Sequence, residues 1–258
     1  MATAWDDPEF VKAWNETYGL AMQNAPIRPG LIFPLLAGKT SNFEGLDLAD
    51  LGCGNGNLIR YFGRAKFKSW TGVDGGGAVI DSAADSVVDP RVKFVHADLT
   101  QPLPLPYAGA DVVTAIFVAE EISAARLKDF FANVARVLKP GGRAYIFSNH
   151  PVNAFFQDME AVRNGGTNKK FEGHKGYFDR DPSTYALSVL NQGQGFSKKA
   201  VYNHHTIGDI VTAFAQAGLC VHDMREVPDR VITLADWENH QPKQGDIPRF
   251  LYLELGRK

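Results

Sequence analysis

Cysteine is scarce in this chain of 258 residues, which contains two of them, Cys53 and Cys220. They lie far apart and share no metal-ligand spacing, so neither a disulfide framework nor a metal site is expected. No apolar run approaches the length of a membrane span. The N-terminus has neither the basic segment nor the apolar core of a signal peptide. These absences predict a cytoplasmic protein with reduced thiols, no membrane partner and no metal.

Positive charge is not in excess either. The formal net charge is -2 at pH 7, and the densest basic cluster is the short stretch 168–170. Nucleic-acid-binding proteins usually carry a basic excess or a basic stripe. A nucleic-acid partner is therefore not expected. The length suits one large domain, or one domain with a modest cap.

Apolar segments of strand length alternate with helical patterns from residue 46 onward. Such alternation predicts a parallel sheet covered by helices on both faces. The last two strands are joined without a clear helix, which suits an antiparallel strand added to the sheet. The expected strands are 46–52, 69–74, 92–98, 110–119, 142–149, 219–227 and 249–258, and the expected helices are 7–23, 31–38, 57–65, 77–86, 124–138 and 206–218.

Three glycines, Gly52, Gly54 and Gly56, stand at alternate positions between the first strand and its helix. Ligands of open α/β sheets bind beyond the carboxyl ends of the strands, so this is the expected ligand loop. The dinucleotide fingerprint requires its third glycine or alanine where this chain has Asn57. The glycines alone leave a plain turn, a phosphate cradle and another kind of ligand site open.

Acidic residues accompany the three successive strands of this region. Asp50 precedes the glycines, and Asp98 ends the third strand. Asp74 ends the second strand, close to the distance of about 20 residues at which an acidic residue binds ribose hydroxyls in such folds. Each aspartate alone is equally well explained as a turn or cap residue. Together they favour a cationic, phosphate-free ligand that contains a ribose and an adenine.

At this point the chain resembles the class I S-adenosylmethionine-dependent methyltransferases. Their first motif is similar to "DLADLGCGNG", their second to "WTGVDGG", and their third, with the segment after it, to "FVHADLTQPLPLPYAGADVV". The segment "RVLKPGGRAYIFSN" is similar to the approach to their fifth strand. The resemblance is strong over 46–149, looser over 204–258, and absent over 151–203.

The resemblance implies a Rossmann-like three-layer α/β sandwich with a mostly parallel seven-stranded sheet and an antiparallel C-terminal strand. It also implies S-adenosylmethionine as cofactor and S-adenosylhomocysteine as product. We expect a single domain over 1–258. Its parts are an N-terminal helical cap (1–45), a cofactor-binding core (46–150 and 204–258) and a substrate-cap insertion rich in glycine and aromatic residues (151–203).

Family roles can be carried over to matching positions. Asp50 would face the amino group of the cofactor, and Asp74 would bind its ribose hydroxyls. Phe117 would line the sulfonium side. The remaining positions at the cofactor are Gly52, Cys53, Gly54 and Gly56 at the methionine half, Gly75 at the ribose or adenine, and Ala97, Asp98 and Leu99 around the adenine. Trp14 and Tyr18 lie one turn apart in the expected N-terminal helix and are candidates to close over the cofactor, although ordinary packing explains them at least as well.

Catalytic residues are harder to find, because methyl transfer requires mainly alignment and exclusion of water. Glu120, just beyond the fourth strand, is a candidate base or a helix cap. His150, at the end of the fifth strand, and His205, before the helix at 206, are further candidates. Histidine titrates near neutrality and can take a proton from a hydroxyl. Glu121, His204 and His174 are weaker candidates, for which structural roles are preferred.

The expected acceptor is a small molecule, and the aromatic stretch 151–203 favours an apolar or aromatic one. No Asn/Asp-Pro-Pro-Tyr/Phe loop follows the fourth strand, which reads "IFVAEEI". Methylation of nucleobases or glutamine by that kind of loop is therefore disfavoured. A protein methyltransferase and a relative that binds the cofactor without methylating remain open. A nicotinamide dehydrogenase is opposed by the glycine spacing.

Overall fold

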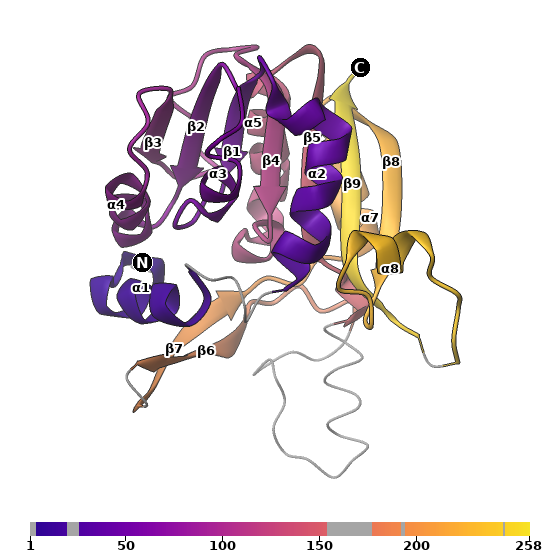
Figure 1. Cartoon of the computed structure of the whole chain (residues 1–258). Coiled ribbons are helices and arrows are strands. Elements are labelled where there is room, and N and C mark those ends of the chain that lie inside the picture. The colour runs from indigo at the N-terminus through magenta and orange to yellow at the C-terminus, as the bar shows by residue number, and fades with distance from the viewer. Residues whose placement is uncertain (1–3, 20–25, 154–176, 192–193, 245) are drawn as a thin grey trace.

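The computed structural model describes residues 4–19, 26–153, 177–191, 194–244 and 246–258. Its main sheet has seven strands in the order β3-β2-β1-β4-β5-β9-β8 (Figure 1). The pairs among the first five strands are parallel, whereas β9 is antiparallel to both of its neighbours, which confirms the predicted sheet. The strands are β1 (Asp47–Leu51), β2 (Ser69–Asp74), β3 (Val92–His96), β4 (Ala110–Ile116), β5 (Leu138–Asn149), β8 (Leu219–Pro228) and β9 (Pro248–Arg257).

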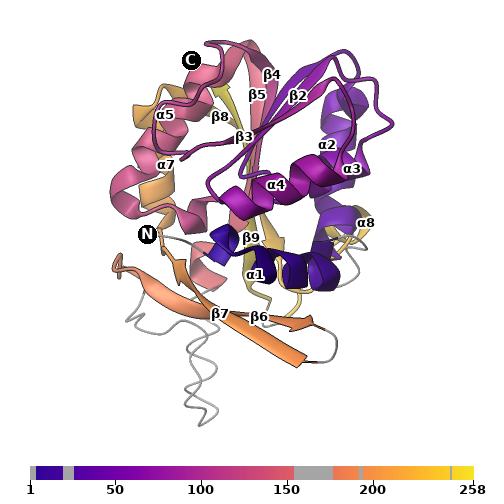
Figure 2. The ribbon, with the colours of Figure 1, turned by 90° about the vertical axis from the view of Figure 1, so that its left-hand side faces the viewer.

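Helices cover both faces of this sheet (Figure 2). On one face α5 (Leu127–Val137) and α7 (Ile207–Gln216) form a core with the inward side chains of the strands. On the other face α2 (Phe33–Thr40) and α3 (Asn57–Tyr61) form a second core, rich in aromatic rings. The molecule is therefore the predicted three-layer sandwich.

A cover lies at the carboxyl ends of the parallel strands. In Figure 1 the arrowheads of β2 and β4 point toward α1 (Pro8–Trp14) and toward a two-stranded ribbon of β6 (Ser183–Asn191) and β7 (Gln194–Tyr202). Helix α1 packs against both α4 (Gly77–Ser86) and this ribbon. Elements far apart in the chain therefore meet above the ligand end of the sheet.

Several element boundaries differ from the sequence-based expectation. The helix expected at 7–23 ends at Trp14 and continues as a π-helical turn, Asn15–Gly19. The fourth strand stops at Ile116, because Phe117 adopts a left-handed φ of 59°. The loop before β9 contains a short helix, α8 (Leu234–Glu238), which Thr233 caps. A hairpin of β6 and β7 stands in the stretch 151–203, where no strand was expected.

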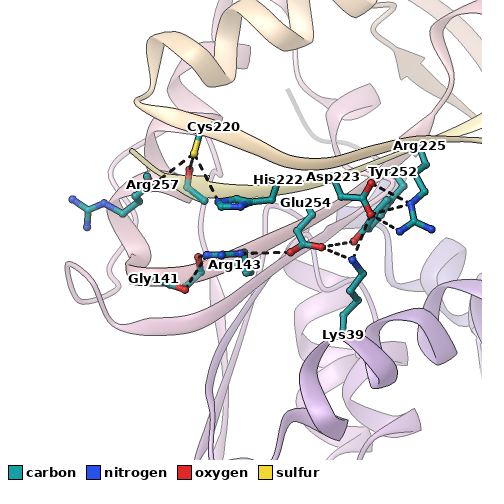
Figure 3. Close-up of polar contacts among 12 residues, drawn as sticks. Lys39, Gly141, Arg143, Cys220, His222, Asp223, Arg225, Tyr252, Glu254 and Arg257 are labelled. Atoms are coloured by element: carbon teal, nitrogen blue, oxygen red, sulfur yellow. Dashed lines mark hydrogen bonds and ion pairs between the residues drawn. The ribbon is translucent and has the colours of Figure 1, made fainter.

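A polar network ties α2 to the C-terminal strands (Figure 3). The carboxylate of Glu254 in β9 lies 2.8 Å from the Lys39 ammonium and 3.5 Å from the Arg143 guanidinium. Lys39 also lies 3.4 Å from Asp223 in β8. The Tyr252 hydroxyl donates to Glu254 over 3.2 Å. This network holds the helix of the N-terminal region to the last two strands of the chain.

Candidate functional site

The glycine loop is held against the end of β2 by backbone contacts. The N–H groups of Gly52 and Cys53 both donate to the Val73 carbonyl, over 2.7 and 3.1 Å. Gly52 has φ +77, and a Cβ there would lie 2.3 Å from Val118 Cγ2. An L side chain at this position would therefore be strained and would also clash. The loop packs tightly against the segment that follows β4.

Gly54 has a different environment from Gly52. Its φ is +55, and a Cβ there would meet nothing within 4 Å. Gly56, with φ +76, immediately precedes α3, and a Cβ there would lie 3.3 Å from Ile59 Cγ2. Open space beside a left-handed glycine leaves room for a ligand to approach the backbone. The loop thus has one tightly packed side and one open side.

Asp74 connects the glycine loop to the start of α4. Its two carboxylate oxygens accept from the N–H groups of Gly54 and Gly76, each over 2.9 Å. Burial raises the pKa of Asp74, and these backbone donors oppose the rise. A carboxylate oxygen has lone pairs for more than one donor. Asp74 can therefore hold the loop and still accept from the two hydroxyls of a ribose.

Asp50 is buried beneath the loop, 3% exposed. The Thr114 hydroxyl donates to its Oδ1 over 2.7 Å. Burial, together with the nearby charge of Asp74, raises the pKa of Asp50 to about 7, although Thr114 and the charge of Arg28 act in the opposite direction. A buried carboxylate in this position is suited to pair with a cationic group.

Arg28 is a site residue that the sequence analysis did not identify. Its guanidinium carbon lies 5.3 Å from the centroid of the Phe117 ring, and its charge acts on Asp50. Burial lowers the pKa of Arg28. Arg28 precedes Pro29 at the start of η3 (Arg28–Ile32), and no motif distinguishes it in the sequence. A cation beside the site is suited to bind a carboxylate.

Phe117 has a φ of 59°, which is uncommon for a residue other than glycine. Its N–H donates to the Phe147 carbonyl over 2.7 Å, and its ring lies 5.4 Å from that of Phe250. Strained backbone of this kind clusters at ligand sites. The strain supports the expected position of Phe117 beside the reacting group.

The predicted adenine positions follow β3. Asp98 is exposed, and its Oδ1 accepts from the Thr100 N–H and hydroxyl, each over 2.8 Å. Asp98 therefore makes the turn contacts that were expected of it if it does not bind a ligand. Ala97 donates to the Asp74 carbonyl over 2.9 Å, and Leu99 is part of the core. Gly75 is exposed between these two strand ends. The predicted adenine-binding residues thus lie together at the carboxyl ends of β2 and β3.

The N-terminal elements cover this edge with residues other than the predicted pair. A Cβ at Gly76 would lie 2.5 Å from Trp5 Cβ, and Asp6 accepts from the Gly77 N–H over 3.0 Å. Asn15 links the Asn55 amide of the glycine loop to the Ser82 hydroxyl of α4.

The predicted cover residues have different surroundings. The Trp14 ring packs on Trp5, with centroids 5.1 Å apart, and with Phe10. The side chain of Tyr18 and the whole of His174 lie outside the described residues.

The cysteine of the loop is a packed thiol. Cys53 is 8% exposed, and a Cβ at Gly72 would lie 2.8 Å from its sulfur. Burial raises the pKa of the Cys53 thiol well above its ordinary value. A neutral buried thiol is a poor nucleophile. Cys53 therefore belongs to the walls of the site.

The candidate bases differ in what their polar atoms contact. His150 is 1% exposed; its Nδ1 accepts from the Val152 N–H over 3.2 Å, and its Nε2 lies 2.8 Å from Glu226 Oε1. Both ring nitrogens are therefore engaged, and burial lowers the pKa of the ring. This arrangement gives His150 a structural role. Glu120 and His205 line one small cavity.

The weaker candidates, His204 and Glu121, do not line this cavity. His204 Nε2 is 2.8 Å from the Tyr177 carbonyl, and Glu121 is exposed. Among the described residues, no group of three or more histidine, cysteine or acidic residues is placed to hold a metal ion. Within the same residues, no helix has the length and apolar character needed to cross a membrane.

Comparison of the sequence with known proteins gives a match to a family model and a match to a curated relative. Residues 48–142 match the family model of a methyltransferase domain. A curated relative, the ubiquinone/menaquinone biosynthesis C-methyltransferase UbiE of Stutzerimonas stutzeri (strain A1501), is 32% identical over 120 residues. That match covers 44% of this chain and 46% of the relative, so the chain spans about half the length of the curated protein it matches.

Solved structures share the fold at low identity. An S-adenosylmethionine-dependent methyltransferase from Clostridium acetobutylicum ATCC 824 superposes with a TM-score of 0.65 at 16% identity, covering 96% of this chain and 98% of that one. The [4+2]-cyclase SpnF superposes with a TM-score of 0.59 at 19% identity, covering 92% and 84%. Structures with this fold therefore include one named as a methyltransferase and one named as a cyclase.

Proposed function

We propose that this chain, which belongs to the class I S-adenosylmethionine-dependent methyltransferases, transfers the methyl group of that cofactor to a small-molecule acceptor. The observation that carries the proposal is the coupling of the glycine loop to Asp74 through the Gly54 N–H. A ribose-binding carboxylate and an open, left-handed backbone are thereby held side by side. The cofactor, when bound, supplies a methyl group on a sulfonium, which is a good leaving group.

The described residues fit the parts of this cofactor. Asp74 would accept from the ribose hydroxyls, and the open side of Gly54 would admit the methionine half. Asp50 would pair with the ammonium group, and Arg28 with the carboxylate. Phe117 would line the sulfonium side. The adenine would lie among Gly75, Ala97, Asp98 and Leu99, with Gly52, Gly56 and Cys53 as the wall of the loop.

The contribution of the protein is alignment and exclusion of water. In-line displacement requires the nucleophile, the methyl carbon and the sulfur to be collinear, and holding that geometry lowers the barrier by a large factor. The cover formed by α1 and the β6–β7 ribbon lies over the same end of the sheet. We expect this cover to hold the acceptor and to shield the transfer from solvent.

A small-molecule acceptor is supported by the name of the relative, a C-methyltransferase of ubiquinone and menaquinone biosynthesis. The net charge of -2 argues against a nucleic-acid acceptor. A cytoplasmic location and an apolar or aromatic acceptor remain parts of the proposal. A protein acceptor is the second candidate. A non-methylating role is the third, and the cyclase with the same fold supports it.

Calorimetry with S-adenosylhomocysteine and with NAD tests the cofactor assignment. We expect binding of S-adenosylhomocysteine alone. Asp74→Ala should weaken that binding about 10- to 100-fold, because hydrogen bonds to a charged group contribute roughly 1.5–3 kcal/mol. Asp85→Ala, at an exposed position of α4, is the matched control. Absence of binding by the unaltered protein would contradict the proposal.

A second experiment tests the reaction. A metabolite extract and, separately, a protein extract are incubated with the enzyme and radiolabelled S-adenosylmethionine. Label in small molecules supports the leading candidate, whereas label in proteins supports the second. Label in neither fraction, together with normal S-adenosylhomocysteine binding, would favour the non-methylating role.

A further inference from the structure

A small cavity lies beyond the carboxyl ends of β4 and β5. It is lined by η5 (Ala119–Glu121), the end of β5, the end of β7 and the residues before α7. Its polar lining includes Glu120, Ser148, Asn149, Asn203 and His205, and none of its lining residues is lysine or arginine. The cavity is therefore unsuited to an anion and suited to a group that donates hydrogen bonds.

Glu120 is fixed in this cavity by three backbone or amide donors. Its Oε1 accepts from the Asn149 N–H, and its carbonyl accepts from the N–H and the amide of Asn203, over 2.8 and 3.1 Å. Glu120 is 8% exposed, and no described residue donates to its Oε2. A buried carboxylate oxygen without a donor is costly. Such an atom in a cavity indicates a ligand that supplies the donor.

His205 presents a second acceptor atom to the same cavity. It is 4% exposed, and its Nε2 lies 2.8 Å from the Ala119 carbonyl, which can only accept. The Nε2 therefore carries the hydrogen, and Nδ1 carries a lone pair. Within the described part of the chain, nothing donates to Nδ1. Burial lowers the pKa of His205, and this favours the neutral ring.

The cavity adjoins the glycine loop through the segment 117–120. Val118 fills the space beside Gly52, Phe117 points its ring toward Arg28, and η5 begins with Ala119 and Glu120. Glu120 is thus three residues beyond the position expected at the sulfonium. A nucleophile in this cavity would be close to the methionine half of the cofactor.

We propose that this cavity receives the protic group of the methyl acceptor, an O–H or N–H, with Glu120 Oε2 and His205 Nδ1 as its hydrogen-bond acceptors. The proposal rests on the proposed methyl transfer and specifies the acceptor class. Two unpaired buried acceptors in one cavity require at least one donor. An acceptor without a protic group would leave both of them unpaired.

In the proposed transfer, Glu120 takes the proton of the acceptor. The proton of the O–H or N–H moves to Glu120 Oε2, and the lone pair that it leaves on oxygen or nitrogen forms the bond to the methyl carbon. The methyl carbon would leave the sulfur of the bound cofactor, which would keep the electron pair of the broken bond. After the products leave, Glu120 releases the proton to water. His205 Nδ1 orients the acceptor and does not change its own protonation.

Binding of simple probes to the full chain saturated with S-adenosylhomocysteine tests this inference. The two probe pairs are phenol with toluene and aniline with toluene. Toluene carries a methyl group where phenol carries its hydroxyl and aniline its amino group, and all three molecules are neutral near pH 7. We expect at least one protic probe to bind about tenfold more tightly than its aprotic partner, as one satisfied buried acceptor predicts. The two pairs distinguish an O–H acceptor from an N–H acceptor.

Variants then test whether Glu120 and His205 cause the tighter binding of the protic probes. In Glu120→Gln the Asn149 N–H holds the amide oxygen, so the amide NH₂ replaces Oε2 and presents a donor. Glu120→Gln and His205→Gln should each weaken the protic preference, and the double variant should abolish it, whereas Glu121→Gln, at an exposed neighbour, should keep it. Unchanged S-adenosylhomocysteine affinity shows that the variants are folded and that the cofactor site is intact.

Equal binding of both members of each pair, including no binding of any probe, would overturn the inference. Retention of the preference in both Glu120→Gln and His205→Gln would overturn it as well. If the unaltered protein does not bind S-adenosylhomocysteine, that result contradicts the proposed function and not this inference.

Discussion

The charge of the site depends on the ionisation of single residues, and Asp50 is the clearest case. Burial raises its pKa to about 7, so it is partly protonated near neutrality in the free protein. The facing charged groups are Asp74 and Arg28. An ammonium group placed beside Asp50 favours its ionised form. Ligand binding and proton release are therefore linked at this carboxyl group.

We expect S-adenosylhomocysteine binding at pH 6 to release up to about one proton, because the pKa of Asp50 falls when the cation arrives. Affinity should rise with pH through the pKa of Asp50, about 7, and level off above about pH 8, where Asp50 is largely ionised in the free protein. Calorimetry in buffers of different ionisation enthalpy measures the release. Asp50→Asn should abolish it, and a release that persists in this variant would contradict the assignment.

Alanine substitutions at three left-handed glycines distinguish the cost of backbone strain, the cost of a steric clash and the loss of a ligand contact. Gly45, Gly52 and Gly54 all have positive φ, but only Gly52 faces an obstructing side chain, Val118. Gly45→Ala should cost about 1–2 kcal/mol of unfolding free energy from backbone strain alone. Gly52→Ala should cost more than Gly45→Ala, because strain and clash add. Gly54→Ala should resemble Gly45→Ala in stability but bind S-adenosylhomocysteine more weakly. Urea unfolding and calorimetry provide both measurements, and equal affinities for the Gly45 and Gly54 variants would refute the ligand contact.

At the scale of elements, the important contact is between the N-terminal helix and the glycine loop. Asn15, just beyond α1, holds Asn55 of the loop and Ser82 of α4. The Asp7 cap of α1 pairs in turn with Lys198 of β7. A chain of side-chain contacts thus runs from the ribbon through α1 to the loop.

Asn55→Ala should loosen α1 without unfolding the sheet, because the second core does not depend on this amide. We expect faster trypsin cleavage after the exposed Lys12, and partial protection by S-adenosylhomocysteine. Asn15→Ala should have the same effect. Asn239→Ala, which removes a local side-chain contact near α8, is the control and should leave the cleavage rate unchanged. An unaltered rate in Asn55→Ala would show that the link does not hold the helix.

At the scale of the whole molecule, cofactor binding joins parts of the chain that are distant in sequence. A ligand that binds only the folded state at 100 times its Kd stabilises that state by about 2.7 kcal/mol. For a domain of this size that corresponds to a Tm increase of about 5–11 °C. Thermal unfolding with S-adenosylhomocysteine should show this increase, and NAD at the same concentration should not. No shift with either ligand would contradict the cofactor assignment.

The sequence by itself determined the sheet, because strand-helix alternation and strand-end aspartates are local patterns. Gly52 and Asp74 can both be recognised from their neighbours in the chain. Only the tertiary structure decided that the half-buried Arg28 acts on Asp50, and that Glu120 and His205 share a cavity. Those contacts join segments far apart in the chain, and no local pattern records which distant side chain will satisfy, or leave unpaired, a buried polar atom. The hairpin of β6 and β7 was likewise not recognised, since its position over the site comes from packing against α1.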